Sequence, residues 1–237
     1  MGDVDETRPS HVQGDVSAIA ALGEPTRRRL YEFVVGQPAP VGRDEAAAAA
    51  GVPRATGAFH LDKLVAEGLL EVVYERRTGR SGPGAGRPSK LYRRSARHIA
   101  VSLPERRYEL AARLLADALQ EAEASGQPPG TTLGRRAHQL GIQIGEAART
   151  AGDTHVAVLP TLREFGFEPR EEGDTVVLAN CPFDTLARQH TELVCGMNLR
   201  LIDGVLEGLA ATGITARLAP RPDHCCVQLL DGSRPDS

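Results

Sequence analysis

The sequence has few of the bulky side chains that commonly anchor a core. It contains no Trp, and aromatic residues make up only 4% of its 237 positions. Hydrophobic residues still account for 41% of the chain. We therefore expect ordinary cores built from Leu, Val and Ala, and the length favours two small domains over one.

The sequence also lacks a long apolar run. No segment approaches the roughly eighteen apolar residues of a membrane span. The polar, acidic start MGDVDETRPS is unlike a signal peptide. We expect a cytoplasmic protein with no membrane partner. Disulfides are rare in that compartment, so its four cysteines more often bind metal or do redox chemistry.

Common catalytic motifs are missing as well. The chain has no G-x-S-x-G, P-loop, H-E-x-x-H or G-x-G-x-x-G element. Cys195 as nucleophile with His190 as base is the alternative, but five helical steps place them about 140° apart on one helix. Cys195 also lies on an apolar stripe, whereas reactive cysteines need access. We therefore expect no enzymatic activity.

Periodicity and Gly/Pro breaks predict the organisation of the chain. The fold class is α+β, with an N-terminal winged helix-turn-helix and a C-terminal domain of helices on an antiparallel sheet. The net charge of −3 alone does not indicate binding to nucleic acid. The expected parts are a tail at 1–14, the winged helix-turn-helix at 15–97, a linking or dimerisation helix at 98–126, a cysteine-containing sensor domain at 127–231 and a tail at 232–237. Within the sensor domain a hairpin is expected over 167–181, with its turn at Gly173 and Asp174.

Residues 16–97 carry the pattern of a winged helix-turn-helix. A helix over 16–35, a short helix over 43–51 and a third helix after Pro53 precede a strand, a Gly/Arg-rich loop and a second strand. In such domains the third helix enters the major groove. Its outward candidates for DNA contact are Arg54, Thr56, His60 and Lys63.

The loop after the third helix is strongly basic. Between positions 76 and 97 there are eight basic residues and no acidic ones. Such a loop suits the phosphate backbone, and a dimer that neutralised roughly eight phosphates would give a log–log salt slope of about −7. A solvated flexible loop is the alternative interpretation. The contact candidates here are Arg76, Arg77, Arg80, Arg87 and Lys90.

Several short segments resemble a known family. ALGEPTRRRLYEFV and GVPRATGAFHLDKLVAEGLL resemble the first and third helices of ArsR-type winged-helix regulators. GRPSKLY is similar to the wing end of many bacterial repressors. The resemblance covers about residues 16–95 and implies binding to double-stranded operator DNA. The thiolate motif that some of these regulators carry on their third helix is absent, because no cysteine precedes position 181.

A long amphipathic helix is expected over 102–125, with Ser102 as its candidate cap. Its wide apolar face carries Leu110, Leu114 and Ala118 beside Ala111, Leu115 and Leu119. This face either packs within its own domain or forms the seam of a homodimer, since regulators of this kind bind paired half-sites.

The four cysteines lie far apart in the sequence. No pair has the two-residue spacing of zinc fingers or bacterial ferredoxins. Cys195 shares a helical stripe with Leu199 and Ile202, while Cys181 is expected to end one strand and Cys225 to open the last. The cysteines could therefore converge as metal ligands, or could simply be buried core residues. Adjacent strand residues face opposite sides, which favours Cys225 over Cys226 as the inward one.

The C-terminal half resembles a second family. CPFDTLARQHTELVCGMNLRLIDG and ARLAPRPDHCCVQL look like the C-terminal domain of the Suf-operon repressors, which bind an iron–sulfur cluster. The resemblance implies a cluster, most simply [4Fe–4S], held by Cys181, Cys195 and one of Cys225 and Cys226. The fourth ligand would be the neighbouring cysteine, His190 or a small molecule. It also implies that the cluster-loaded form represses.

The sequence therefore predicts a homodimeric transcription repressor whose affinity for DNA is set by an iron–sulfur cluster. Alternative sensors are zinc at the same thiolates, a thiol-redox switch without metal, or an organic effector in an apolar pocket.

Overall fold

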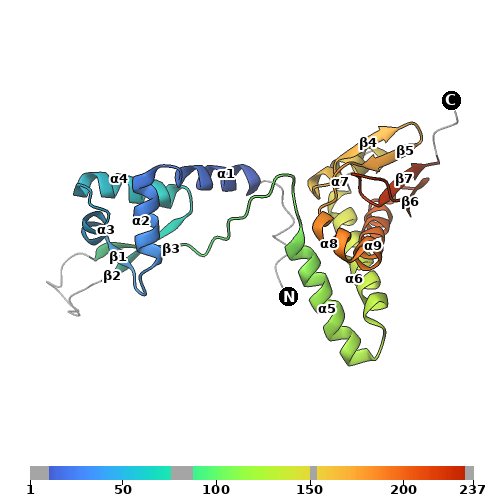
Figure 1. Ribbon diagram of the computed structural model, residues 1–237, viewed down its shortest axis with the longest axis horizontal. Helices are drawn as coiled ribbons and strands as arrows, with labels where there is room; N and C mark the ends of the chain where they lie inside the picture. The colour runs from blue at the N-terminus through green and yellow to red at the C-terminus, as the bar shows by residue number, and fades with distance from the viewer. Residues whose placement is uncertain (1–10, 76–87, 150–153, 233–237) are drawn as a thin grey trace. The chain divides into compact units, whose positions relative to one another are not determined.

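The computed structural model describes residues 11–75, 88–149 and 154–232 of the chain. These residues belong to two compact units, 1–101 and 102–237, each with its own hydrophobic core (Figure 1). The α+β class is confirmed: the first unit is a helix-turn-helix and the second packs helices on an antiparallel sheet. Among the described helices, none has both the length and the apolar character that a membrane crossing needs.

The first unit places helices against a small antiparallel sheet of order β1-β3-β2. Its core is aliphatic, as expected, with Leu30, Leu61 and Leu64 fully buried beside Tyr92. Its described elements are α1 (His11–Ala21), α2 (Pro25–Val35), β1 (Val41–Gly42), α3 (Arg43–Ala49), α4 (Arg54–Ala66), β2 (Leu70–Glu75) and β3 (Ser89–Arg94).

Helices α3 and α4 form the helix-turn-helix. Gly51 adopts a φ of 66° in the turn, and the amide of Val52 donates to the carbonyl of Ala47 at 3.0 Å. Gly57 lets the two helices approach closely, because a Cβ built there would lie 2.7 Å from the Cβ of Ala47. The turn and this contact fix α4 as the second helix of the motif, with its buried side on α3.

The second unit packs helices against a sheet of order β4-β5-β7-β6, in which all pairs are antiparallel, and further helices pack on those helices. The long helix α9 is buried between α6 and the strands β6 and β7. Its described elements are α5 (Tyr108–Ser125), α6 (Pro129–Ala148), α7 (Thr154–Glu164), β4 (Pro169–Glu172), β5 (Thr175–Leu178), α8 (Asp184–Gln189), α9 (Thr191–Leu209), β6 (Ile214–Leu218) and β7 (Val227–Asp231).

Helices α6 and α9 touch through their backbones. Each carries a pair of glycines four residues apart, and a Cβ on any of the four would lie between 2.1 and 2.4 Å from a carbonyl oxygen of the other helix. Close backbone approach packs α6 directly on α9, which in turn lies against the sheet (Figure 1). The four residues are Gly141 and Gly145 in α6 and Gly204 and Gly208 in α9.

The structure corrects several expected boundaries. The segment 16–35 is two helices instead of one, and α1 begins at His11, within the expected tail. Ser102 caps no helix, because α5 begins only at Tyr108. This helix belongs to the second unit and its buried stripe packs on α6, so it is not a separate linking element. Helix α8 was not expected, whereas the hairpin turn at Gly173 and Asp174 lies between β4 and β5 as predicted.

Candidate nucleic-acid interface and cysteine site

The outward face of α4 is the candidate reading surface. Gly57, Leu61 and Leu64 are buried against the first unit, which turns the opposite side of the helix to solvent. Arg54 and Lys63 are exposed there, as the sequence predicts, and Thr56 is half-buried. The face therefore presents charged groups at both ends of the helix.

The charged residues of this face are paired with carboxylates of the same unit. Arg54 Nε lies 2.6 Å from Asp44 Oδ1, which belongs to the first turn of α3. Lys63 Nζ lies 2.6 Å from Glu67 Oε1, one turn further along. Exposed pairs of this kind are worth little in water, so both cations can exchange these carboxylates for phosphates at small cost.

A partly exposed hydrogen-bond network connects α4 to the second strand of the wing. Asp62 Oδ1 accepts from Lys90 Nζ at 2.5 Å and from the Tyr92 hydroxyl at 2.9 Å. Burial alone would raise the pKa of Asp62, but these two hydrogen bonds lower it below its ordinary value. The hydrogen bond to Asp62 raises the pKa of Lys90. Lys90 thus fixes the base of the wing on α4, besides being a candidate for phosphate contact.

His60 does not project outward as expected. Its side chain is only 15% exposed, and its Nδ1 lies 3.7 Å from Glu24 Oε2 at the start of α2. Glu24 is also the N-cap of α2, where it accepts from the amides of Thr26 and Arg27 at 2.9 and 2.6 Å. The hydrogen bond from the Thr26 amide is the main reason why the pKa of Glu24 falls to about 2. His60 is therefore a packing residue between α4 and α2.

Much of the basic loop lies outside the described residues, including the predicted contacts Arg76, Arg77, Arg80 and Arg87. Three of the four described basic residues of this segment, Lys90, Arg93 and Arg97, form ion pairs, although the segment itself contains no acid. Besides Lys90, Arg93 pairs with Glu71 at 2.5 Å and Arg97 with Asp15 at 2.7 Å. The loop sequence has no acids, but the fold brings carboxylates to it from α1, α4 and β2.

Sequence reasoning missed an exposed aromatic residue on the same face. Phe59 is 67% exposed, and the small residue Ala55 lies one turn before it. The buried positions Leu61 and Leu64 already define the inward side of α4, so the signal was present: an aromatic residue stands out of phase with the apolar stripe.

The second unit brings the four cysteines together as two neighbouring pairs. Cys195, in the second turn of α9, is joined to Cys226 in a disulfide with a Cα–Cα distance of 6.3 Å. Cys181 and Cys225 are free, buried thiols that hydrogen-bond to each other. Because Cys225 and Cys226 are consecutive, the two pairs are adjacent.

The local backbone explains why both adjacent cysteines contribute. The last strand begins at Val227, so Cys225 and Cys226 precede it in irregular structure, after Asp223 with a φ of 58°. The expectation that Cys225 opens the strand is therefore wrong, although Cys225 is the more buried of the two cysteines, as expected. The Cys225 amide donates to the carbonyl of Leu178 at 2.8 Å, which brings the segment to the end of β5. Cys181 follows β5 by three residues rather than ending it.

The two free thiols differ in the direction of their pKa shifts. The hydrogen bond from Cys225 lowers the pKa of Cys181, and the same bond together with burial raises the pKa of Cys225. Asn198 Nδ2, one turn after Cys195, lies 3.2 Å from Cys225 Sγ and donates to it. The Asn198 side chain is buried, and no described residue hydrogen-bonds to its Oδ1. Cys181 is thus the thiol of this pair that ionises first.

The donor set has the chemistry of an iron–sulfur site, since thiolates are the usual cluster ligands. The sulfurs are arranged differently, as one disulfide and one hydrogen-bonded pair. Within the described ranges, no three or more His, Cys, Asp or Glu side chains are arranged as ligands of a metal ion. His190 is exposed at the residue before α9. Cluster or zinc ligation at all four cysteines therefore requires the Cys195–Cys226 bond to be reduced.

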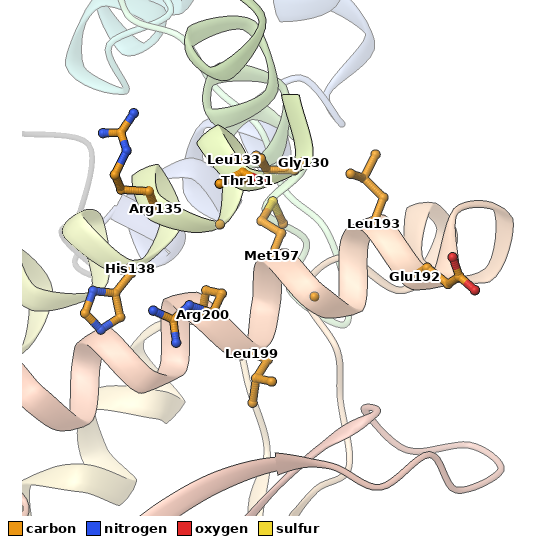
Figure 2. Close-up of a pocket in the computed structure, with 12 residues that line it drawn as sticks. Gly130, Thr131, Leu133, Arg135, His138, Glu192, Leu193, Met197, Leu199 and Arg200 are labelled. Atoms are coloured by element: carbon orange, nitrogen blue, oxygen red, sulfur yellow. The ribbon is translucent and has the colours of Figure 1, made fainter. Parts of the chain in front are cut away.

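A pocket of about 560 Å³ lies in the groove between α6 and α9 (Figure 2). Leu133 and Met197 line it with apolar surface. The basic residues around it are neutralised by their own chain: Arg200 pairs with Asp203 at 3.0 Å, His138 with Glu207 at 3.2 Å and Arg135 with Glu121. The groove therefore has room for an organic effector, and among its described lining residues Glu192 carries a charge that no ion pair neutralises.

Comparison with known proteins bears on the first unit. The model of a family described as a helix-turn-helix domain matches residues 22–73, which run from the end of α1 into β2. Neither the search of curated proteins nor the search of solved structures finds a match. Helix-turn-helix domains read DNA through their second helix, which here is α4. The match indicates a DNA-binding transcription regulator.

Proposed function

We propose that this protein is a homodimeric transcription repressor of the bacterial cytoplasm whose affinity for operator DNA is set by the four cysteines of its second unit. An iron–sulfur cluster would be bound by Cys181, Cys195, Cys225 and Cys226. The observation that carries it is the gathering of all four cysteines of the chain at one place in the fold.

DNA binding is supported by the helix-turn-helix match and by the chemistry of α4. Arg54 and Lys63 stand at its two ends, each in an exposed ion pair that phosphate can replace. Arginine is also the commonest side chain that reads guanine in the major groove. The first unit thus supplies both positioning and base contacts.

Cluster binding is supported by the number and chemistry of the thiols. Four thiolates are the usual ligand set of a [4Fe–4S] centre. The lowered pKa of Cys181 favours its thiolate, and Asn198 donates a hydrogen bond to the sulfur of Cys225. A bound cluster would supply an oxygen-labile centre. The cysteines would be its ligands, and the burial of three of them together with that of Asn198 would limit the access of solvent to it.

Sensing requires only a small energetic connection between the units. Cys195 lies in α9, which packs on α6, and α6 packs on α5 at the start of the second unit. A change at the cysteines therefore acts on the helices nearest to the DNA-binding unit in the sequence. A coupling of about 1.4 kcal/mol is enough for a tenfold change in DNA affinity.

An anaerobic preparation of the full chain tests the cluster. We expect iron and acid-labile sulfide in the protein, a broad absorption band at the blue end of the visible spectrum, and tighter DNA binding before exposure to oxygen than after. Cys181→Ser and Cys195→Ser should each lower the iron content. Zinc in place of iron and sulfide, or full iron retention in both variants, would contradict the cluster.

The disulfide favours a second candidate function, a thiol-redox switch without metal. Cytosolic disulfides, where they occur, are commonly redox-sensing or catalytic, and here Cys195 and Cys226 are already within bonding geometry. Reduction would transfer two electrons and two protons to this pair and free α9 from the segment before β7.

Cys181→Ser separates the two candidates, because it removes a cluster ligand but leaves the Cys195–Cys226 pair intact. A redox switch predicts that this variant still responds to a dithiol reductant, with two alkylatable thiols gained on reduction, as counted by mass spectrometry. A cluster predicts that its response to oxygen is lost. Light scattering on the same preparations measures the expected dimer.

A further inference from the structure

Phe59 is an unusual residue for the surface of α4. Its side chain is 67% exposed, although Leu61 and Leu64 on the opposite side of the same helix are fully buried. Ala55 lies one turn before it and is also exposed. Together these two residues form an apolar strip on a helix face that is otherwise charged.

The side chain of the neighbouring residue His60 contacts the exposed ring of Phe59. The His60 ring meets it edge-on, with centroids 5.2 Å apart and planes at 69°. His60 in turn lies against Glu24 and is only 15% exposed, so it forms a fixed wall on one side of the phenyl ring. The outward side of the ring remains open to a ligand.

The chemistry of the major groove identifies that ligand. Thymine is the base that presents a methyl group there, and apolar side chains such as Phe contact it. We propose that Phe59 contacts a thymine methyl and makes the protein select thymine at one position of its site. The inference rests on the proposed DNA-binding function and adds a specificity that the charged residues do not supply.

The surroundings favour DNA over a protein on this face. Arg54 precedes the strip and Lys63 follows it, and both are exposed and suited to phosphates or bases. An isologous contact centred on Phe59 would bring Arg54 of one copy near Lys63 of the other, and this like-charge approach is unfavourable. The apolar strip is also short, whereas a stable protein interface needs a broad apolar centre.

The test uses the full-length protein and duplex DNA. Selection from a random duplex pool first yields the preferred site. Each thymine of that site is then replaced by deoxyuridine, which lacks only the methyl group, and binding is measured by fluorescence anisotropy at fixed salt. Wild-type protein should lose about fourfold in affinity at one thymine, the factor for one buried methylene-sized group.

Phe59→Ala should bind the thymine and deoxyuridine duplexes equally, while Phe59→Leu keeps part of the difference. Tyr74→Ala is the matched control, because it removes another exposed aromatic residue of the same unit and should retain the fourfold ratio. Circular dichroism checks that the variants remain folded, as expected for an exposed position.

Three results would overturn the inference. If Phe59→Ala still distinguishes thymine from deoxyuridine, another group contacts the methyl. If wild type does not distinguish them, no group does. In both cases the proposed DNA-binding function remains and the role of Phe59 is refuted. If Phe59→Ala changes the oligomeric state in light scattering, the strip is a protein interface. If wild type selects no sequence from the pool, the proposed DNA-binding function itself fails.

Discussion

The contact between α6 and α9 gives the sharpest test of the second unit. We consider Gly204→Ala in the C-terminal half of α9. A Cβ at this position would lie 2.1 Å from the carbonyl oxygen of His138 and 3.0 Å from the amide nitrogen of Ile142. Both atoms belong to the backbone of α6, so no flexible side chain can move aside. The helices must therefore separate.

The magnitude follows from that separation. Ordinary contact begins near 3.5 Å, so the helices would have to move apart by more than about 1 Å. Overpacking of this kind costs up to about 3 kcal/mol. Alanine recovers about 1 kcal/mol because it loses less backbone entropy in a helix than glycine does. We expect a net loss of about 2 kcal/mol in the stability of the second unit.

Gly196→Ala on the same helix is the matched control, because a Cβ there meets nothing within 4 Å. It should gain about 0.5–1 kcal/mol from helix propensity alone. Hydrogen exchange followed by mass spectrometry reports on peptides of α6 and α9 separately from the first unit. Gly204→Ala should speed their exchange about thirtyfold. If both variants instead slow exchange equally, the helices do not pack at the described distance.

Three further predictions concern other parts of the chain. Gly57→Ala should loosen the helix-turn-helix and weaken DNA binding, because its Cβ would lie 2.7 Å from that of Ala47; the overpacking cost is about 1–3 kcal/mol, and a salt titration should show an unchanged slope if only positioning is lost. Glu24→Gln should remove part of the acid sensitivity of the first unit. The pKa of Glu24 is about 2 in the folded chain against an ordinary 4.5, so its stabilising effect is full above the ordinary value and is lost as the pH falls toward 2; acid unfolding followed by circular dichroism checks this, and equal acid profiles for both proteins would refute it. Cys195→Ser should leave two buried thiols and no disulfide, and alkylation without reductant should then label Cys226 as a third thiol; if Cys226 stays protected, it pairs elsewhere.

Local patterns in the sequence correctly predicted most of the elements. The inward stripe of α4 and the position of Cys195 near the start of α9 follow from helical periodicity. The hairpin turn at Gly173 follows from its need for a positive φ, observed at 67°. The break between α1 and α2 was missed because Glu24 caps α2 with its side chain, where Ser, Thr, Asp or Asn is the usual signal.

The sequence by itself therefore determined the class of the fold, the presence of a DNA-reading helix and the supply of four thiols. These depend on periodicity and composition, which act over a few residues. Only the tertiary structure decided which side chains that are distant in the sequence contact one another. Carboxylates distant in the chain pair with Lys90 and Arg93 of the wing, and His60 turns toward α2 instead of solvent.

The pairing of the cysteines was decided in the same way. Cys195 meets Cys226 across 31 residues of separation, and the two adjacent cysteines divide between two partners. Spacing along the chain carries no information on such contacts, because they depend on how α9 and the segment before β7 pack on the sheet. The close approach of α6 and α9 through four glycines is likewise visible only in the tertiary structure. In the sequence, each glycine indicates only a less stable helix, whereas in the fold it makes room for the backbone of the other helix.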